Sequence, residues 1–236
     1  MSTKKNISEF NRDVEARGGY AYTDERYSAC RANERLTNAT IERIPGNCGS
    51  LVDIGCGDGT YTQKLKQAFP QMKVLGLDAA AAAVNLAQAK YPEIEFRTAD
   101  VTEPLPLNET FDVAVVRGLL HHTADPEAAL RNISRAASRI IMIEPNGNNP
   151  VLKIIEKVSP YHRAHEERSF SAGLLRKWCE EAGLRVISLD YVNFVPFFCP
   201  ELLARVIYFF QPFLEKLPLL RNFLSGQIVM TAETRS

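Results

Sequence analysis

Residues 52–61 read Val-Asp-Ile-Gly-Cys-Gly-Asp-Gly-Thr-Tyr, and this stretch decides the fold. An apolar strand end carries one acid, Asp53, and runs into three glycines that are separated by single residues. Glycine has no Cβ, so such a loop can turn sharply and let the backbone approach a ligand closely. A helical pattern follows at once. The stretch therefore predicts a strand, a tight turn and a helix, with a ligand at the turn.

The same alternation of strand and helix continues on both sides of this stretch. Apolar runs that predict strands cover residues 51–54, 73–77, 94–98, 111–116 and 139–143. Helical patterns cover residues 28–44, 61–68, 79–90 and 126–137. The alternation predicts an α/β fold of the doubly wound, Rossmann-like kind, a parallel sheet with helices on both faces. Right-handed crossovers bring the carboxyl ends of the strands to one edge, where ligands bind in such sheets.

The composition narrows the class of protein. The 236 residues suit one domain, and 28 basic side chains balance 28 acidic ones. A net charge near zero gives no general attraction to nucleic acid, so we expect no nucleic-acid partner. Five scattered cysteines without a C-x-x-C pair predict neither a disulfide framework nor a zinc ribbon. A polar N-terminus and the lack of a long uncharged apolar run predict a cytoplasmic protein without a transmembrane helix.

Acidic residues follow the first three predicted strands. The glycine spacing is G-x-G-x-G, shorter than the dinucleotide fingerprint, which fits a ligand with no phosphate at the loop. Asp78 ends the second strand, where a carboxylate can accept hydrogen bonds from a ribose diol. Asp100 follows the third strand and can accept a bond from an adenine amino group, and Asp53 can face a ligand ammonium. We expect Gly76, by contrast, to be structural.

Four segments carry a resemblance to a known family: residues 52–59 (VDIGCGDG), 76–78 (GLD), 99–101 (ADV) and 111–116 (FDVAVV). In this order and spacing they look like the motifs of class I S-adenosylmethionine-dependent methyltransferases, over about residues 50–145. The resemblance implies a seven-stranded sheet whose last strand is antiparallel, with residues 184–192 and 227–232 as its sixth and seventh strands. Residues 117–122 (RGLLHH) resemble the small-molecule and quinone-biosynthesis branch, in which a histidine often occurs here.

The resemblance also implies roles for individual residues toward S-adenosylmethionine. The glycine loop lies under the methionine part of the cofactor, Asp78 binds the ribose and Asp100 binds the adenine. The cofactor-binding residues that we predict are Asp53, Gly55, Cys56, Gly57, Asp78, Ala79, Asp100, Val101 and Arg117.

The chain is expected to form a single domain in three parts. Residues 1–48 are predicted to be an N-terminal helical lid, and Tyr20, Tyr22 and Tyr27 lie in it as candidates to touch the cofactor. Residues 49–145 are the cofactor-binding core. Residues 146–236 are the half that faces the acceptor, with an apolar helical insertion at 194–224.

Histidines are the candidate general bases, because imidazole titrates near neutral pH. The chain has four: His121, His122, His162 and His165. Adjacent side chains diverge, so at most one of His121 and His122 faces the acceptor. We predict His122 and His165 as the catalytic residues. With Glu144 and Glu166 the histidines lack a compact ligand spacing, so no metal site is expected.

The segment 194–224 is unusually apolar, and its prolines break it into pieces too short to span a bilayer. It forms either a helical subdomain that packs on the core or on a dimer partner, or a contact with a greasy acceptor or the membrane surface that carries it. A peripheral membrane contact and a homodimer therefore both stay open.

These observations predict a methyltransferase that acts on a small or lipid-like molecule, at oxygen, by direct displacement. The alternatives are a protein, peptide or RNA methyltransferase, a nicotinamide-dependent oxidoreductase, and a cofactor-binding module without catalysis. The neutral charge argues against RNA. The glycine spacing and the lack of a tyrosine–lysine catalytic pair argue against the oxidoreductase.

Overall fold

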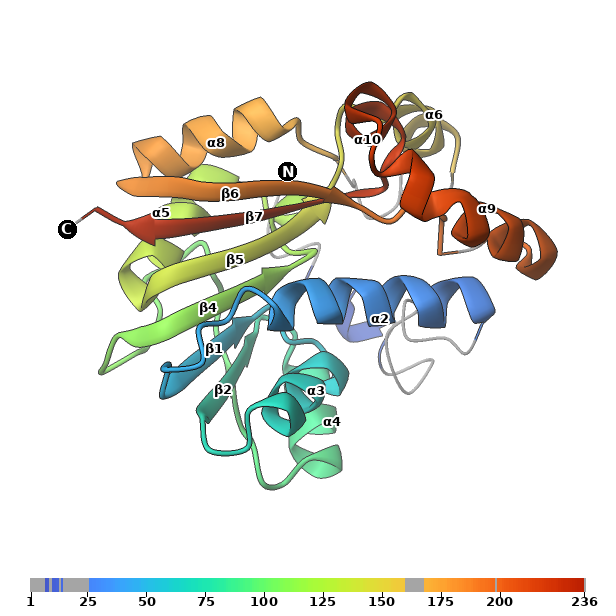
Figure 1. The fold of residues 1–236 in the computed structure, drawn as a ribbon. Helices are drawn as coiled ribbons and strands as arrows, with labels where there is room; N and C mark the ends of the chain where they lie inside the picture. The colour runs from blue at the N-terminus through green and yellow to red at the C-terminus, as the bar shows by residue number, and fades with distance from the viewer. Residues whose placement is uncertain are drawn as a thin grey trace.

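A computed structural model describes residues 7, 8, 10–12, 14, 26–159, 168–197 and 199–235. They form one seven-stranded sheet in the order β3-β2-β1-β4-β5-β7-β6 (Figure 1). The strands are β1 (Ser50–Ile54), β2 (Lys73–Asp78), β3 (Glu95–Thr98), β4 (Phe111–Arg117), β5 (Ala137–Pro145), β6 (Leu184–Val192) and β7 (Gln227–Thr234). The first five pair in parallel, and β7 is antiparallel to both β5 and β6. The predicted fold, with an antiparallel last strand, is confirmed.

Helices cover both faces of this sheet (Figure 1). On one face α2 (Tyr27–Ile41), α3 (Thr60–Ala68) and α4 (Ala81–Lys90) bury apolar side chains against the strands. On the other face α5 (Pro126–Ala136) and α8 (Ala172–Glu181) do the same, with Trp178 of α8 against Phe170. The central strands β1, β4 and β5 thus send alternate side chains into two separate cores, as expected for strands that are buried on both sides.

Four further elements lie beyond the carboxyl edge of the central strands. They are the 3₁₀ turn η2 (Leu120–His122) and the helices α6 (Pro150–Val158), α9 (Glu201–Leu214) and α10 (Pro218–Leu224). Figure 1 shows α6, α9 and α10 gathered together at this edge, with α2 passing beneath α9. These helices lie where the sheet meets its ligands.

Side chains at helix starts explain why the helices begin where they do. The carboxylate of Asp125 accepts a hydrogen bond from the backbone N–H of Ala128 and caps α5. Asn149 accepts bonds from the first turn of α6 in the same way, and Ser171 caps α8. In α5 and α6 a proline follows the cap, at a position where the missing N–H costs nothing.

The structure corrects several predicted boundaries. α2 ends at Ile41 rather than at residue 44, and α4 begins at Ala81 because the N–H of Ala80 bonds to Asp78. β5 extends to Pro145, since its register with β7 continues to the end of both strands. α9 runs through Pro212 to Leu214, so this proline removes one backbone hydrogen bond without ending the helix. Within the described residues, no helix has the length and apolar character needed to cross a membrane.

Candidate functional site

A cavity of about 1100 Å³ opens at the carboxyl edge of the sheet. One part lies at the ends of β1, β2 and β3, and the other part lies under α6, α9 and the segment before it. All nine residues predicted to bind the cofactor line this cavity, as do His121 and His122. His165, the second predicted base, lies outside the described residues, as do His162, Tyr20 and Tyr22. Tyr27 packs against Tyr208 and is not among the cavity-lining residues.

The glycine loop is held against the end of β2 by Asp78. The backbone N–H of Gly57 donates to Oδ2 of Asp78 over 2.9 Å, and the N–H of Ala80 donates to Oδ1 over 2.8 Å. Gly55 and Gly57 have φ of 83° and 55°, a conformation that favours glycine. Burial raises the pKa of Asp78, and the two N–H bonds oppose that rise. The loop and the acid therefore form one preorganised unit at the cavity wall.

Asp53 is a buried acid behind the loop. The hydroxyl of Thr62, in α3, donates to its Oδ2 over 2.6 Å. Burial raises the pKa of Asp53 to about 6, although the Thr62 bond and the charge of Arg117 oppose the rise. An acid with this pKa changes its charge within the range of pH in which enzymes work.

Arg117 joins the cavity to α2. Its guanidinium donates to the side-chain oxygens of Thr37 over 3.0 Å and Asn33 over 2.8 Å, and it lies 3.9 Å from the centre of the Tyr61 ring. Burial lowers its pKa. The predicted contact of Arg117 with the cofactor is not tested, but the structure shows that its polar atoms already fix α2 to the end of β4.

Asp100 lies at the third predicted position, after β3. Its Oδ1 accepts bonds from the backbone N–H and the hydroxyl of Thr102, which fix the carboxylate in place. Asp53, Asp78 and Asp100 thus all reach one cavity, as their positions at successive strand ends predict.

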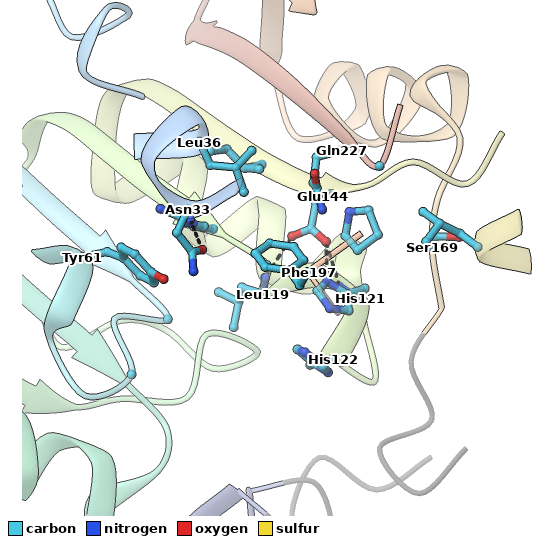
Figure 2. Close-up of a pocket in the computed structure, with 18 of the residues that line it drawn as sticks. Asn33, Leu36, Tyr61, Leu119, His121, His122, Glu144, Ser169, Phe197 and Gln227 are labelled. Carbon is cyan, nitrogen blue, oxygen red and sulfur yellow. Dashed lines mark hydrogen bonds and ion pairs between the residues drawn. The ribbon is translucent and has the colours of Figure 1, made fainter. Parts of the chain in front are cut away.

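The residue that sequence reasoning undervalued is Glu144, at the end of β5. Its buried carboxylate accepts backbone N–H bonds from the three residues Leu119, Leu120 and His121. Its Oε2 also lies 2.8 Å from Nδ1 of His121 (Figure 2). Glu144 lies at the end of β5, and His121 lies shortly after the end of β4. The two strands are neighbours, so strand adjacency was the signal that could have found the pair.

His122 has a different environment. Its ring packs against that of His121, with centroids 3.9 Å apart and planes tilted by 41°. The centroid of the Phe10 ring lies 5.0 Å away, with its plane nearly perpendicular. Figure 2 shows His121 between Glu144 and His122. Among the residues that the structure describes, no cluster of three or more His, Cys, Asp or Glu side chains could hold a metal ion.

The second part of the cavity has an apolar wall. It is formed by α6, by the segment that follows β6, by α9 and by the end of α10: Val151, Leu152, Ile155, Val158, Phe194, Val195, Phe197, Ile207, Leu214 and Leu224. Figure 2 places Phe197 next to the Glu144–His121 pair. The apolar wall and the polar strand ends therefore meet at this pair.

Residues 51–139 match the family profile described as "Methyltransferase domain". This match, over 89 of the 236 residues, supports the resemblance to class I S-adenosylmethionine-dependent methyltransferases that the sequence predicts. The family's cofactor is the one that the sequence predicts. The quinone-biosynthesis branch is not tested by these matches and stays a prediction.

Curated relatives in this family share a limited stretch with the chain. A release factor glutamine methyltransferase of Aliivibrio fischeri is 25% identical over 133 residues, 54% of this chain and 47% of that protein. A trans-aconitate 2-methyltransferase of Azoarcus sp. is 26% identical over 140 residues, 58% of this chain and 53% of that protein. The matched stretch thus spans about half the length of these relatives.

Solved structures share the fold over nearly the whole chain. Magnesium protoporphyrin IX methyltransferase of Synechocystis, solved with S-adenosylhomocysteine bound, has a TM-score of 0.63 and 18% identity, and covers 98% of this chain and 96% of its own. The [4+2]-cyclase SpnF has a TM-score of 0.67 and 20% identity, and covers 98% of this chain and 93% of its own. Because one neighbour is described as a cyclase, the fold alone does not establish methyl transfer.

Proposed function

We propose that this protein is an enzyme that transfers a methyl group from S-adenosylmethionine to an oxygen of a small or lipid-like acceptor. The observation that carries the proposal is a single cavity in which the glycine loop and three acids meet the Glu144–His121 pair and an apolar wall. The first group of residues suits the cofactor, and the second suits a weakly polar acceptor with an ionisable group.

The residues at the strand ends fit the cofactor chemically. Gly55 and Gly57 carry no side chain toward the cavity, so the methionine part can lie close to the backbone. Each oxygen of Asp78 accepts one backbone bond and keeps a further lone pair for the ribose hydroxyls. Asp100 is proposed to accept a bond from the adenine amino group, and Asp53 to balance the ammonium group. When bound, the cofactor supplies a methyl group that its positively charged sulfur activates.

We propose His121 as the general base. The Glu144 carboxylate can only accept a hydrogen bond, so it selects the tautomer of His121 that carries its proton on Nδ1. Nε2 then keeps its lone pair and can take a proton from an acceptor hydroxyl. His122 and His165 stay candidates from the sequence, and the ring of His122 packs against that of His121.

Much of the rate enhancement would come from positioning, because the methyl group is already activated. Holding the acceptor oxygen in line with the methyl carbon can contribute roughly 7–11 kcal/mol in favourable cases. The apolar wall excludes water from that line of approach and orients an acceptor by its apolar part. This wall favours a more apolar acceptor than trans-aconitate, which the Azoarcus relative is named for.

Calorimetry tests the proposed cofactor. We expect S-adenosylmethionine and S-adenosylhomocysteine to bind and NADH not to bind. Binding of NADH alone would support the nicotinamide-dependent oxidoreductase instead, and failure of both sulfur ligands to bind would overturn the proposal.

A second measurement tests catalysis. Methyl transfer from a radiolabelled donor is assayed against phenols, carboxylic acids and lipid-tailed hydroxyl compounds, with peptide and RNA pools beside them. We expect label in the hydroxyl compounds. Label only in peptide or RNA would shift the function to those acceptors, and tight cofactor binding without any transfer would indicate a binding module.

A further inference from the structure

The exposed apolar side chains of this protein gather on one surface. Within the described residues, every large hydrophobic side chain that is strongly exposed, apart from Ile187 on β6, lies on α6, α9, α10 or the link between the last two. We call this set the outer apolar surface: Val151, Ile154, Val158, Leu202, Leu203, Val206, Phe209, Phe210, Phe213, Leu217, Leu220, Phe223 and Leu224. An apolar patch on this scale is rare on a monomer that has no partner for it.

The side of α9 that faces the protein already packs against other residues. The exposed side is therefore not the side that the helix would turn toward the core. Ala204 and Gln211 are buried, and the hydroxyl of Tyr208 donates to the backbone oxygen of Ser28 at the start of α2. Arg35 of α2 forms an ion pair with Glu215, just after α9. With the helix held in this way, Phe209 and Phe213 are 79% and 64% exposed. Removing such side chains from water is favourable, which favours their contact with an apolar phase.

The outer apolar surface opens directly into the acceptor part of the cavity. Val151 and Val158 of α6 are 51% and 67% exposed, yet both also line the cavity. Leu224, at the end of α10, belongs to both sets as well. These three residues mark a mouth through which an apolar molecule could pass from the surface to His121 without crossing water. A second copy of the chain seated here would close that mouth.

The charges around the outer apolar surface are predominantly positive. α6, α9, α10 and their link carry five basic and three acidic side chains. Each acid is engaged within the chain: Glu156 by Lys153 and Ser169, Glu201 by Arg205 and Glu215 by Arg35. Lys157 and Lys216 lie exposed beside the apolar side chains. Helices that lie on anionic lipid carry basic side chains next to their apolar face. α9 alone has few of these, but α6 and α10, which contact each other, supply more at the edge of the same surface.

We propose that the outer apolar surface docks on an anionic lipid bilayer and that a lipid-tailed acceptor enters the cavity from that bilayer. The acceptor's class rests on the proposed function, whereas docking on the bilayer does not. α6, α9 and α10 have 9, 14 and 7 residues, so they are suited to lie on a bilayer rather than to cross it. The phenylalanines would enter the acyl boundary, and the lysines would meet the lipid phosphates.

Vesicle sedimentation tests this proposal without cofactor or acceptor. The full chain is mixed with vesicles of phosphatidylcholine, alone or blended with phosphatidylglycerol, and the fraction that sediments with the lipid is measured. We expect binding to the blended vesicles, weaker binding to the neutral ones, and at least a tenfold loss in the double variant Phe209→Asp/Phe213→Asp. Ile187→Asp is the matched control, because it places the same charge on an exposed apolar site of β6, and it should bind as the parent does.

Calorimetry with S-adenosylhomocysteine separates the possible failures. The double variant should keep the affinity of the parent, which shows that it is folded and that loss of lipid binding is local. If the parent binds S-adenosylhomocysteine but sediments with neither vesicle, the docking proposal is overturned while the proposed function stands. It is also overturned if ultracentrifugation shows a dimer that the double variant dissociates, since the surface is then an interface between copies.

Discussion

Oε2 of Glu144 lies 2.8 Å from Nδ1 of His121, and the same carboxylate accepts the backbone N–H groups of the turn that carries the histidine. The acid therefore fixes the position of the turn and the tautomer of the imidazole at once. In a catalytic triad, an acid orients a histidine that activates a nucleophile of the protein. Glu144 would orient His121 in the same way, but the nucleophile would be the acceptor. This arrangement makes His121 the histidine that the structure shows held by a buried acid.

Replacing His121 should therefore affect turnover more than replacing His122. With an acceptor in hand, we expect His121→Ala to lower kcat by about 10²–10⁴, the usual worth of a general base. His122→Ala should lower it by less than tenfold, and both variants should bind S-adenosylhomocysteine as the parent does. Steady-state kinetics and calorimetry measure the two effects. The reverse order of the two losses would assign the base to His122 instead.

Glu144→Gln tests the tautomer rather than the presence of the imidazole. The amide that this variant introduces would donate an N–H to Nδ1 of His121, so Nδ1 would accept a hydrogen bond and the ring proton would be on Nε2. With Nε2 protonated, the ring can no longer take a proton from the acceptor. We expect kcat to fall by about 10²–10⁴ in this variant, with the affinity for the methyl donor retained. Glu144→Asp keeps the acceptor character and should recover part of the rate. A parent-like rate in Glu144→Gln would show that the pair is structural.

Asp78→Ala should weaken cofactor binding. Two hydrogen bonds from the ribose to a charged group would be lost, and the Gly57 N–H would lose its partner, which together cost about 1.5–3 kcal/mol of binding free energy. Asp112→Ala is the matched control, because this carboxylate also accepts backbone N–H bonds, from Gly49 and Ser50, but lies at the opposite end of β4. Calorimetry should show weaker binding for the first variant only. Equal affinities in both would reject the ribose role.

The meeting of the three acids at one cavity could be predicted from the sequence because it depends on local features. Asp53, Asp78 and Asp100 each lie at or just after the end of a strand, and parallel strands bring such ends to one edge without further information. The Glu144–His121 pair is not local. It depends on the pairing of β4 with β5 and on a 3₁₀ turn whose three N–H groups converge on one carboxylate. No spacing in the sequence encodes that turn.

The apolar segment 194–224 could also be predicted only in part from the sequence. Its prolines and phenylalanines predict broken helices, but they do not show which face is buried. That depends on the contacts of α9 with α2, through Tyr208 and Glu215, and on where α6 and α10 meet. Only those contacts show which side chains are exposed, which line the cavity and which do both.

Asp53 should make both stability and ligand affinity depend on pH. Its pKa is raised to about 6 in the folded protein, so its favourable contribution to folding is complete below pH ~4 and is lost as the pH rises through about 6. Asp53→Asn removes this titration. The free energy of unfolding of the variant, relative to the parent, should therefore rise by about 2–3 kcal/mol between pH 4 and pH 7.5.

Chemical denaturation at the two values of pH measures this difference, and a pH-independent difference would contradict the raised pKa. Ligand binding provides the complementary test. The affinity of the parent for S-adenosylmethionine should rise as Asp53 ionises through pH 6, and that part of the rise should be missing in Asp53→Asn. Asp78, whose pKa is also raised, is present in both proteins.

Gly76 should prove structural although it lies only two residues before Asp78, the acidic end of β2. A Cβ at this position would lie 2.3 Å from Cδ1 of the buried Phe96 ring and 3.1 Å from Sγ of Cys56. Gly76→Ala must therefore displace the ring, at a cost of about 1–3 kcal/mol in the free energy of unfolding.

Gly173→Ala is the matched control: nothing lies within 4 Å of its Cβ, and in helix α8 alanine should stabilise by about 0.5–1 kcal/mol. In urea denaturation, the free energy of unfolding should fall in Gly76→Ala and rise in Gly173→Ala. Both variants should keep the ligand affinity of the parent under conditions in which they are folded. A loss of affinity in Gly76→Ala without a loss of stability would instead place Gly76 in the cofactor site.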